Sequence, residues 1–184
     1  MDKQNAKKRI LEYFKKNHIP YKHLNEEQKI QELSNIDTIY FSSPAPNVIY
    51  GHIETTLRFR ESHVYCQSYY CQPVVEQDEE EINRACRIIN YINSNLFYDS
   101  IYPSSLVLDE DDGDIYNGTL IRYELLEEYF YETMSCILDL QVQKLSDICA
   151  PILGYITKEA NFHIAAHVLI GHDLMNKSIP FIDD

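Results

Sequence analysis

The 184-residue chain has no tryptophan, only five glycines and few basic residues. Its 16 Lys and Arg stand against 29 Asp and Glu, so the formal net charge is -13. Binding to nucleic acid requires clustered Lys and Arg that displace counterions from phosphates, so this composition argues against a nucleic-acid partner. The sequence also contains no P-loop, no GxGxxG and no GxSxG. These absences leave an enzymatic interpretation without a recognisable active site.

Long apolar runs and cysteine pairs are missing as well. No segment approaches the ~20 apolar residues of a membrane span, and the N-terminal segment MDKQNAKKRILEYF lacks the apolar stretch of a secretion signal. The five cysteines form no CxxC pair. An odd set of cysteines in mostly apolar patterns favours reduced thiols that pack as small hydrophobic side chains. We therefore expect a cytoplasmic protein that has no membrane partner and needs no disulfide.

Apolar residues make up 45% of the sequence, and 15 residues are tyrosines. In a chain of this length, that fraction supplies one hydrophobic core without metal or disulfide support. We therefore expect a single domain over residues 1–184.

Hydrophobic spacing predicts a helix, three strands, a helix, two strands and a final long helix. Apolar residues recur at intervals of three and four in residues 3–17, 79–96 and 126–156, whereas they alternate between residues 36 and 74. A turn that contains Gly113 joins the last two strands. This order defines an α+β domain with a five-stranded antiparallel sheet and with helices packed on one of its faces.

Finer expectations concern the segments within and beside this order. Residues 25–33 resemble a short capped helix, and alternation over residues 48–60 predicts one strand. Pro151 is expected to kink or divide the long helix. Residues 159–170 form a last short helix, which Gly171 ends.

The middle of the chain reads RIINYINSNL, then SSLVLDEDDGDIYNGTL, then a long apolar helix that ends in APILGYI. Together with the order of elements, these segments resemble the YbjN family, whose members look like type III secretion chaperones in fold. The resemblance covers a core of about residues 36–156. It implies a protein-binding or chaperone-like domain that is often dimeric, with no catalytic residue and no cofactor. Residues 22–35, which resemble an added helix, and the helical C-terminal extension 157–184 depart from the pattern.

Two histidines offer the clearest metal-ligand spacing. His163 and His167 lie four residues apart on a predicted helix, and His172 and Asp173 follow. The segment HIAAH lacks the glutamate of the hydrolytic HExxH motif, and no other cluster supplies the remaining ligands. We therefore predict no metal at these histidines. A metal-binding domain or metal-dependent enzyme that uses His163, His167 and His172 is the alternative.

Two further candidate sites have simpler interpretations. The acidic string that begins at Asp109 places Gly113 fifth, whereas an EF-hand loop requires glycine at the sixth position. It is therefore interpreted as a charged hairpin tip. Cys66 and Cys71 lie five residues apart on one predicted strand, so they point to opposite faces and are not expected to pair.

Tyrosines mark a candidate binding surface on the predicted sheet. Tyr65 and Tyr69 fall on one side of their strand, and Tyr50 falls opposite Ile53 and Leu57 on its own. Tyrosine recurs at binding hot spots, and an unpaired strand edge offers backbone groups for strand addition. We expect a partner peptide on the exposed sheet edge or on the polar sheet face, with Tyr50, Tyr65 and Tyr69 as candidate anchors. Alternatively, these rings lie under a helix or only decorate the surface.

The sequence thus favours a non-enzymatic adaptor or chaperone-like module that binds a segment of a partner protein. A homodimer is expected too, because the helix stripes are wide enough to leave Tyr91 and Ile92 uncovered by one sheet. The rival interpretations are the metal-dependent domain described above and a purely structural dimer.

Overall fold

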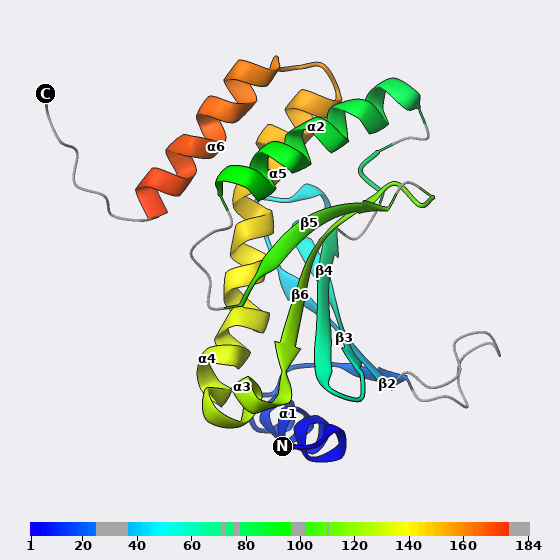
Figure 1. Ribbon diagram of the computed structural model, residues 1–184. Coiled ribbons are helices and arrows are strands. Elements are labelled where there is room, and N and C mark those ends of the chain that lie inside the picture. Colours follow the sequence, from blue (N-terminus) through cyan, green and yellow to red (C-terminus); the bar gives the residue numbers. More distant parts are fainter. Residues whose placement is uncertain (25–36, 71–72, 76–77, 97–101, 110, 177–184) are drawn as a thin grey trace, which may run out of the picture.

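A computed structural model of the protein describes residues 1–24, 37–70, 73–75, 78–96, 102–109 and 111–176 (Figure 1). Its strands form one antiparallel sheet in the order β1-β2-β3-β4-β6-β5. The five predicted strands are β2 (Asp37–Pro44), β3 (His52–Phe59), β4 (His63–Tyr70), β5 (Ser104–Asp109) and β6 (Asp114–Arg122). The α+β class and the antiparallel sheet are thereby confirmed.

A short sixth strand, β1 (Lys22–Leu24), pairs with β2. Its three residues were expected to begin an added helix, and that expectation is wrong. Lys22 lies opposite Tyr40 and Leu24 opposite Thr38, so pairing with a distant strand overrides the local pattern. The rest of the predicted helix, residues 25–33, lies outside the described residues.

Most of the helices bury their apolar side chains against one face of this sheet, while the last one packs on two other helices (Figure 1). They are α1 (Lys3–Lys16), α2 (Glu79–Asn95), α3 (Tyr123–Glu128), α4 (Phe130–Ser135), the π-helical turn η4 (Cys136–Leu140), α5 (Gln141–Ile156) and α6 (Phe162–Asn176). Asp2 and Asp78 begin the first two helices, because their carboxylates accept hydrogen bonds from free backbone N–H groups of the first turn.

The core divides into two clusters along the sheet. One joins α1, α3 and α4 to the sheet, and in it the Phe14 and Phe41 rings meet edge to face with centroids 5.1 Å apart. The other joins α2, α5 and α6 to the opposite end, around Ile53, Ile92 and Ile152. Full burial of such side chains contributes roughly 1.5–3 kcal/mol each. The helices therefore hold both ends of one face, and the other face of the sheet carries no described helix.

The long predicted helix is divided, although not where the sequence indicated. The helix is interrupted at Tyr129, whose backbone has φ -120° and ψ 50°. It then passes through the wider π-helical turn η4. Helix α5 runs on through Pro151. Pro151 lacks an N–H donor, but its helix is held by tertiary packing on both sides, which offsets the lost hydrogen bond.

Two other boundaries differ from expectation. Gly171 does not end α6, which continues to Asn176. Residues 48–51 are not part of a strand, because Tyr50 and Gly51 both have positive φ (67° and 72°) and form the turn η3 (Ile49–Gly51). Strand β3 therefore begins at His52, and Tyr50 lies outside the sheet.

The acidic hairpin tip between β5 and β6 is docked on the chain that follows β4. The backbone N–H groups of Val74 and Val75 donate to the carbonyl oxygen of Gly113 at 2.9 and 3.1 Å. Gly113 has φ 73°, a conformation that side-chain-bearing residues rarely adopt. The turn is thus the hairpin that the sequence predicts, and its glycine also permits this close approach.

Replacing Gly113 with alanine should lower the free energy of unfolding by about 2–4 kcal/mol. The new Cβ would lie 2.1 Å from the Val75 carbonyl oxygen, in addition to the strain of a positive φ. Urea-induced unfolding measures the change. Gly171→Ala is the matched control, because a Cβ there meets nothing within 4 Å and alanine favours a helix by about 0.5–1 kcal/mol. Unchanged stability in Gly113→Ala would contradict the docked tip.

Candidate functional site

The outer edge of β5 is blocked at Leu106 by a side chain of α2. The Asn93 side-chain Nδ2 donates to the Leu106 carbonyl oxygen at 2.9 Å, and its Oδ1 accepts from the Leu106 N–H at 2.8 Å. The amide thereby imitates the two hydrogen bonds that a neighbouring strand would make. Strand addition at this edge would first have to displace Asn93.

The opposite edge, on β2, is only half covered. Strand β1 pairs with residues 38–40, and no described strand pairs with the outer side of residues 41–44. The Ala45 N–H donates to the Gly51 carbonyl oxygen at 2.8 Å, and pairing with β3 is continuous over the whole of β2. Because the backbone groups of successive residues alternate in direction, those of Ser42 and Pro44 point away from β3. This edge therefore presents one N–H and two carbonyl groups for pairing.

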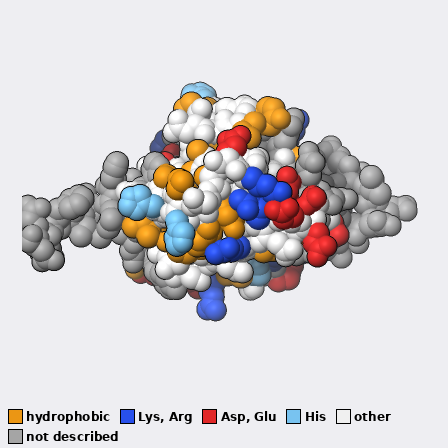
Figure 2. Space-filling model, turned by 90° about the horizontal axis from the view of Figure 1, so that it is seen from above, with side chains coloured by type: hydrophobic (Ala, Val, Ile, Leu, Met, Phe, Trp, Pro, Cys, Tyr) orange, Lys and Arg blue, Asp and Glu red, His pale blue; other side chains and the backbone are white. Residues whose placement is uncertain are grey.

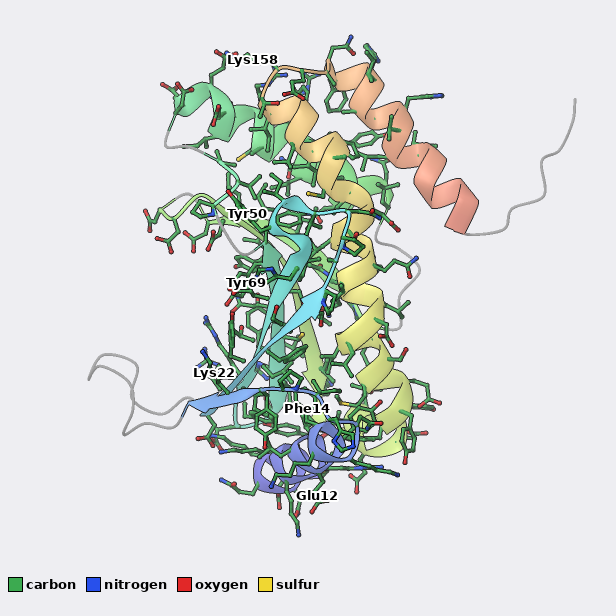
Figure 3. The ribbon with its side chains drawn as sticks, turned by 180° about the vertical axis from the view of Figure 1, so that it is seen from behind. Glu12, Phe14, Lys22, Tyr50, Tyr69 and Lys158 are labelled. Carbon is green, nitrogen blue, oxygen red and sulfur yellow. The ribbon has the colours of Figure 1, made fainter. Side chains whose placement is uncertain are left out.

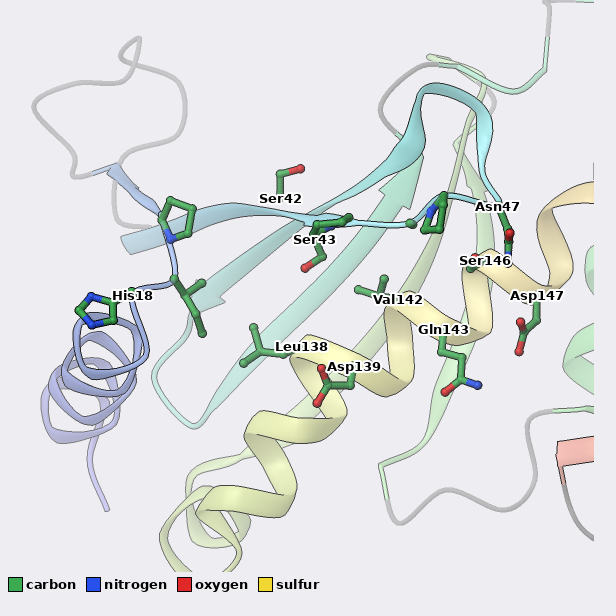
Figure 4. Close-up of a pocket in the computed structure, with 15 residues that line it drawn as sticks. His18, Ser42, Ser43, Asn47, Leu138, Asp139, Val142, Gln143, Ser146 and Asp147 are labelled. Atoms are coloured by element: carbon green, nitrogen blue, oxygen red, sulfur yellow. The ribbon is translucent and has the colours of Figure 1, made fainter.

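A groove of about 660 Å³ runs beside this unpaired half of β2 (Figure 4). Residues 18–20 close one end and residues 45–47 the other, while a helical wall faces the strand. The wall is formed by one side of η4 and α5: Leu138, Asp139, Val142, Gln143, Ser146 and Asp147. Figure 4 shows the wall and the strand running alongside each other, with Ser43 and Val142 between them. An extended segment placed here would have a sheet edge on one side and a helix on the other.

The end of α1 positions residues 18–20, which close one end of the groove. The Ile19 N–H donates to the Phe14 carbonyl oxygen at 2.9 Å, and the His18 N–H to that of Lys15 at 3.3 Å. These two bonds form a Schellman motif, in which the residue at the position of His18 is usually glycine. His18 adopts φ 55° there and lies exposed at the end of the groove.

A buried amide holds the helical wall on the sheet. Gln141 is 2% exposed, its Oε1 accepts from Ser68 Oγ at 3.0 Å, and its Nε2 donates to Thr119 Oγ1 at 2.7 Å. The Cys66 thiol also lies 3.4 Å from Oε1. Such a network is costly to break because each partner would be left buried and unpaired, so Gln141 fixes where Leu138 and Val142 stand relative to β2.

Tyr65 and Tyr69 share the open face of the sheet, as the alternation predicts. Tyr50 lies in the turn before β3 and does not join them, as the positions of Tyr50 and Tyr69 in Figure 3 show. Tyr50 is 59% exposed. Tyr65 is half-buried, and a Cβ on Gly118 would lie 2.7 Å from its hydroxyl oxygen. Its ring therefore packs over Gly118 of β6 and is part of the sheet's own packing.

Burial also raises the pKa of both phenols. Desolvation is the main cause at Tyr65, with neighbouring Tyr116 next, and burial raises the pKa of Tyr69 to about 12. Nearby, the Tyr40 hydroxyl donates to the Glu54 carboxylate. The open face is thus a set of half-buried polar contacts, whereas the groove beside β2 offers a hollow next to an unpaired strand edge.

His163 and His167 lie on α6 with exposed side chains, and the side chain of His172 is outside the described part of the structure. Across the described residues, no group of three His, Cys, Asp or Glu side chains is placed to bind a metal ion. The surrounding surface of α6 is apolar, with Ile164 and Val168 54% and 40% exposed. Figure 2 shows histidine and hydrophobic side chains together on this side of the molecule, and acidic and basic ones gathered elsewhere on the same face.

The structure contradicts the argument that Tyr91 and Ile92 are left uncovered for a second copy of the chain. Ile92 is fully buried, and the Tyr91 ring meets that of Phe162 of the same chain at a centroid distance of 5.4 Å. Helix α6 therefore covers residues that the sequence left for a second copy. The homodimer itself stays a prediction.

A scan against protein-family models finds no match, and neither do searches of curated proteins and of solved structures. None of the helices that the structure describes is long and apolar enough to cross a membrane. The resemblance to the YbjN family therefore stays a prediction.

The buried cysteines should resist thiol reagents. Burial raises the pKa of the Cys66, Cys136 and Cys149 thiols, so little reactive thiolate forms at about pH 8, whereas Cys86 is partly exposed. We expect iodoacetamide to modify Cys86 at least about tenfold faster than the other three, measured by peptide mass spectrometry. A Cys71→Ser background removes the fifth cysteine. Labelling of Cys66 at the rate of Cys86 would contradict this burial.

Protein purified without a histidine tag should contain far less than stoichiometric zinc, because His163 and His167 lack further ligands in the described structure. Elemental analysis measures the content. Stoichiometric zinc that disappears in the His163→Ala, His167→Ala double variant would instead support the metal-binding alternative.

Proposed function

We propose that the protein is a non-enzymatic adaptor or chaperone-like module that binds an extended segment of a partner protein by strand addition to β2. The observation that supports this most directly is the difference between the two sheet edges. Asn93 blocks the edge of β5 at Leu106, while Ser42 and Pro44, on the half of β2 that β1 leaves unpaired, line a groove. The proposal includes a cytoplasmic setting and no cofactor.

The groove suits a peptide chain better than a compact ligand. A strand laid against residues 41–44 would receive backbone hydrogen bonds from one side, and alternate side chains would point toward the helical wall. The wall combines the buried Val142 with the half-buried Leu138. Backbone bonds would thus supply affinity that is independent of sequence, and the wall would select side chains.

Proline at position 44 limits the length of the added strand. Its backbone points outward but has no N–H to donate, so pairing toward Asn47 weakens. Toward the other end, the chain of β1 already occupies the edge from residue 40. The bound segment would therefore pair over about four residues of β2.

Replacing Ser42 with proline tests the proposal. The substitution removes the one outward N–H of this edge and should be tolerated by the fold, because that N–H makes no bond to β3. Peptides of about ten residues, selected from a random displayed library on the wild-type protein, should bind Ser42→Pro at least about tenfold more weakly in fluorescence anisotropy.

Ser42→Ala is the matched control, since it keeps the backbone N–H and should bind within about threefold of the wild type. Tyr69→Ala should do the same, because Tyr69 lies on the open face. Thermal unfolding checks that each variant is folded. Selection of no peptide, or equal affinity for Ser42→Pro and wild type, would contradict strand addition at β2. Loss of binding in Tyr69→Ala alone would shift the site to the open face.

A further inference from the structure

A row of polar side chains crosses the buried face of the sheet, between the two apolar clusters of the core. On β6 the residues that flank this row are Ile115, which belongs to one cluster, and Ile121, which belongs to the other. The register brings the members of the row together from β3 to β5: Thr55, Ser68, Asn117, Thr119 and Ser104. Polar groups in such a place are costly unless each has a hydrogen-bond partner.

One end of the row is satisfied by side chains. Ser68 Oγ donates to Gln141 Oε1 at 3.0 Å, so Thr55 Oγ1, 2.9 Å from Ser68 Oγ, is the donor of that pair. Gln141 Nε2 then donates to Thr119 Oγ1 at 2.7 Å. A continuous chain of hydrogen bonds therefore runs from Thr55 on β3 to Thr119 on β6.

The other end of the row has no such partners. Asn117 is fully buried, and neither its Nδ2 nor its Oδ1 reaches a hydrogen-bonding group of any residue that the structure describes. The same is true of Ser104 Oγ, which is also buried. Each buried polar group in this state loses its hydration without compensation, so three of them beside one another indicate a bound polar molecule.

The pairing of β5 with β6 places these three atoms close together. Both backbone groups of Leu106, which lies opposite Asn117, point outward to Asn93. That pair is therefore non-hydrogen-bonded, and so is the pair of Ser104 with Thr119, two residues along. In such pairs the side chains approach closely, and diagonal neighbours such as Ser104 and Asn117 have Cβ atoms no more than about 7 Å apart. A water bonded at about 2.8 Å to each of two atoms spans up to about 5.6 Å.

We propose that an ordered internal water binds between Asn117 and Ser104. Water suits the site because Nδ2 has to donate and Oδ1 has to accept, while the serine hydroxyl does either. An ion would meet no charged side chain in the row, and an apolar molecule would leave all three atoms unpaired. The water continues the polar row to β5 and completes the boundary between the two apolar clusters. The site does not depend on the strand addition proposed above.

A crystal structure of the full chain at about 1.5 Å resolution tests the site directly. It should show a water within about 3.2 Å of both Ser104 Oγ and an amide atom of Asn117. An Asn117 amide that bonds directly to Ser104 or to another protein group would overturn the proposal. The absence of any water within hydrogen-bond distance of Asn117 would overturn it equally.

A cycle of variants tests in solution whether the two residues share the water. Asn117→Val removes both amide atoms and Ser104→Ala removes the hydroxyl, and urea-induced unfolding measures each folding equilibrium constant. Ser104→Ala should lower this constant at least about threefold more in the wild type than in Asn117→Val, where the water has already lost its main partner. Asn117→Ala replaces Asn117→Val if the latter does not fold.

Ser105→Ala is the matched control, because it makes the same change one residue along β5, on the exposed side of the strand. Its effect should be the same in both backgrounds. An effect of Ser104→Ala that is likewise independent of Asn117 would contradict a shared water.

Discussion

An open antiparallel sheet leaves a row of backbone donors and acceptors unpaired at each edge. In this protein the two edges, β5 and β2, are covered in different ways. At β5 the side chain of Asn93 makes both hydrogen bonds that a neighbouring strand would make to Leu106. At β2 the short strand β1 covers half of the edge and then ends. The asymmetry leaves residues 41–44 of β2 without a described neighbouring strand on their outer side.

The position of the helical wall depends on a polar contact rather than on apolar packing alone. Apolar side chains of similar size tolerate small shifts, whereas the Gln141 amide has its donor and its acceptor satisfied only in one placement over Ser68 and Thr119. Gln141 follows directly on the π-helical turn η4. The extra residue in that turn rotates the chain, so that Gln141 faces the sheet while Asp139 faces the groove. One buried amide thus fixes the start of α5 over β4 and β6.

Local pattern predicted the elements well and their junctions poorly. Alternation identifies β4 because its side chains point in turn to the helices and to the open face of the sheet. Its buried and partly exposed residues therefore alternate with a period of two. The turn at Tyr50 was missed because its residues alternate as a strand would, and only the left-handed backbone ends the strand. The bond from Asn93 to Leu106 could not be predicted, because it depends on how α2 lies across β5.

An unpaired edge is also a route to self-association, and the charges around it bear on which partner is accepted. A second copy that offered its own β2 edge would bring another Asp139 and Asp147 to the same place, together with a second chain of net charge -13. Like charges at short range oppose that pairing, and the missing N–H of Pro44 removes a hydrogen bond from it. The β2 edge is therefore disfavoured as a pairing site for a second copy of the protein.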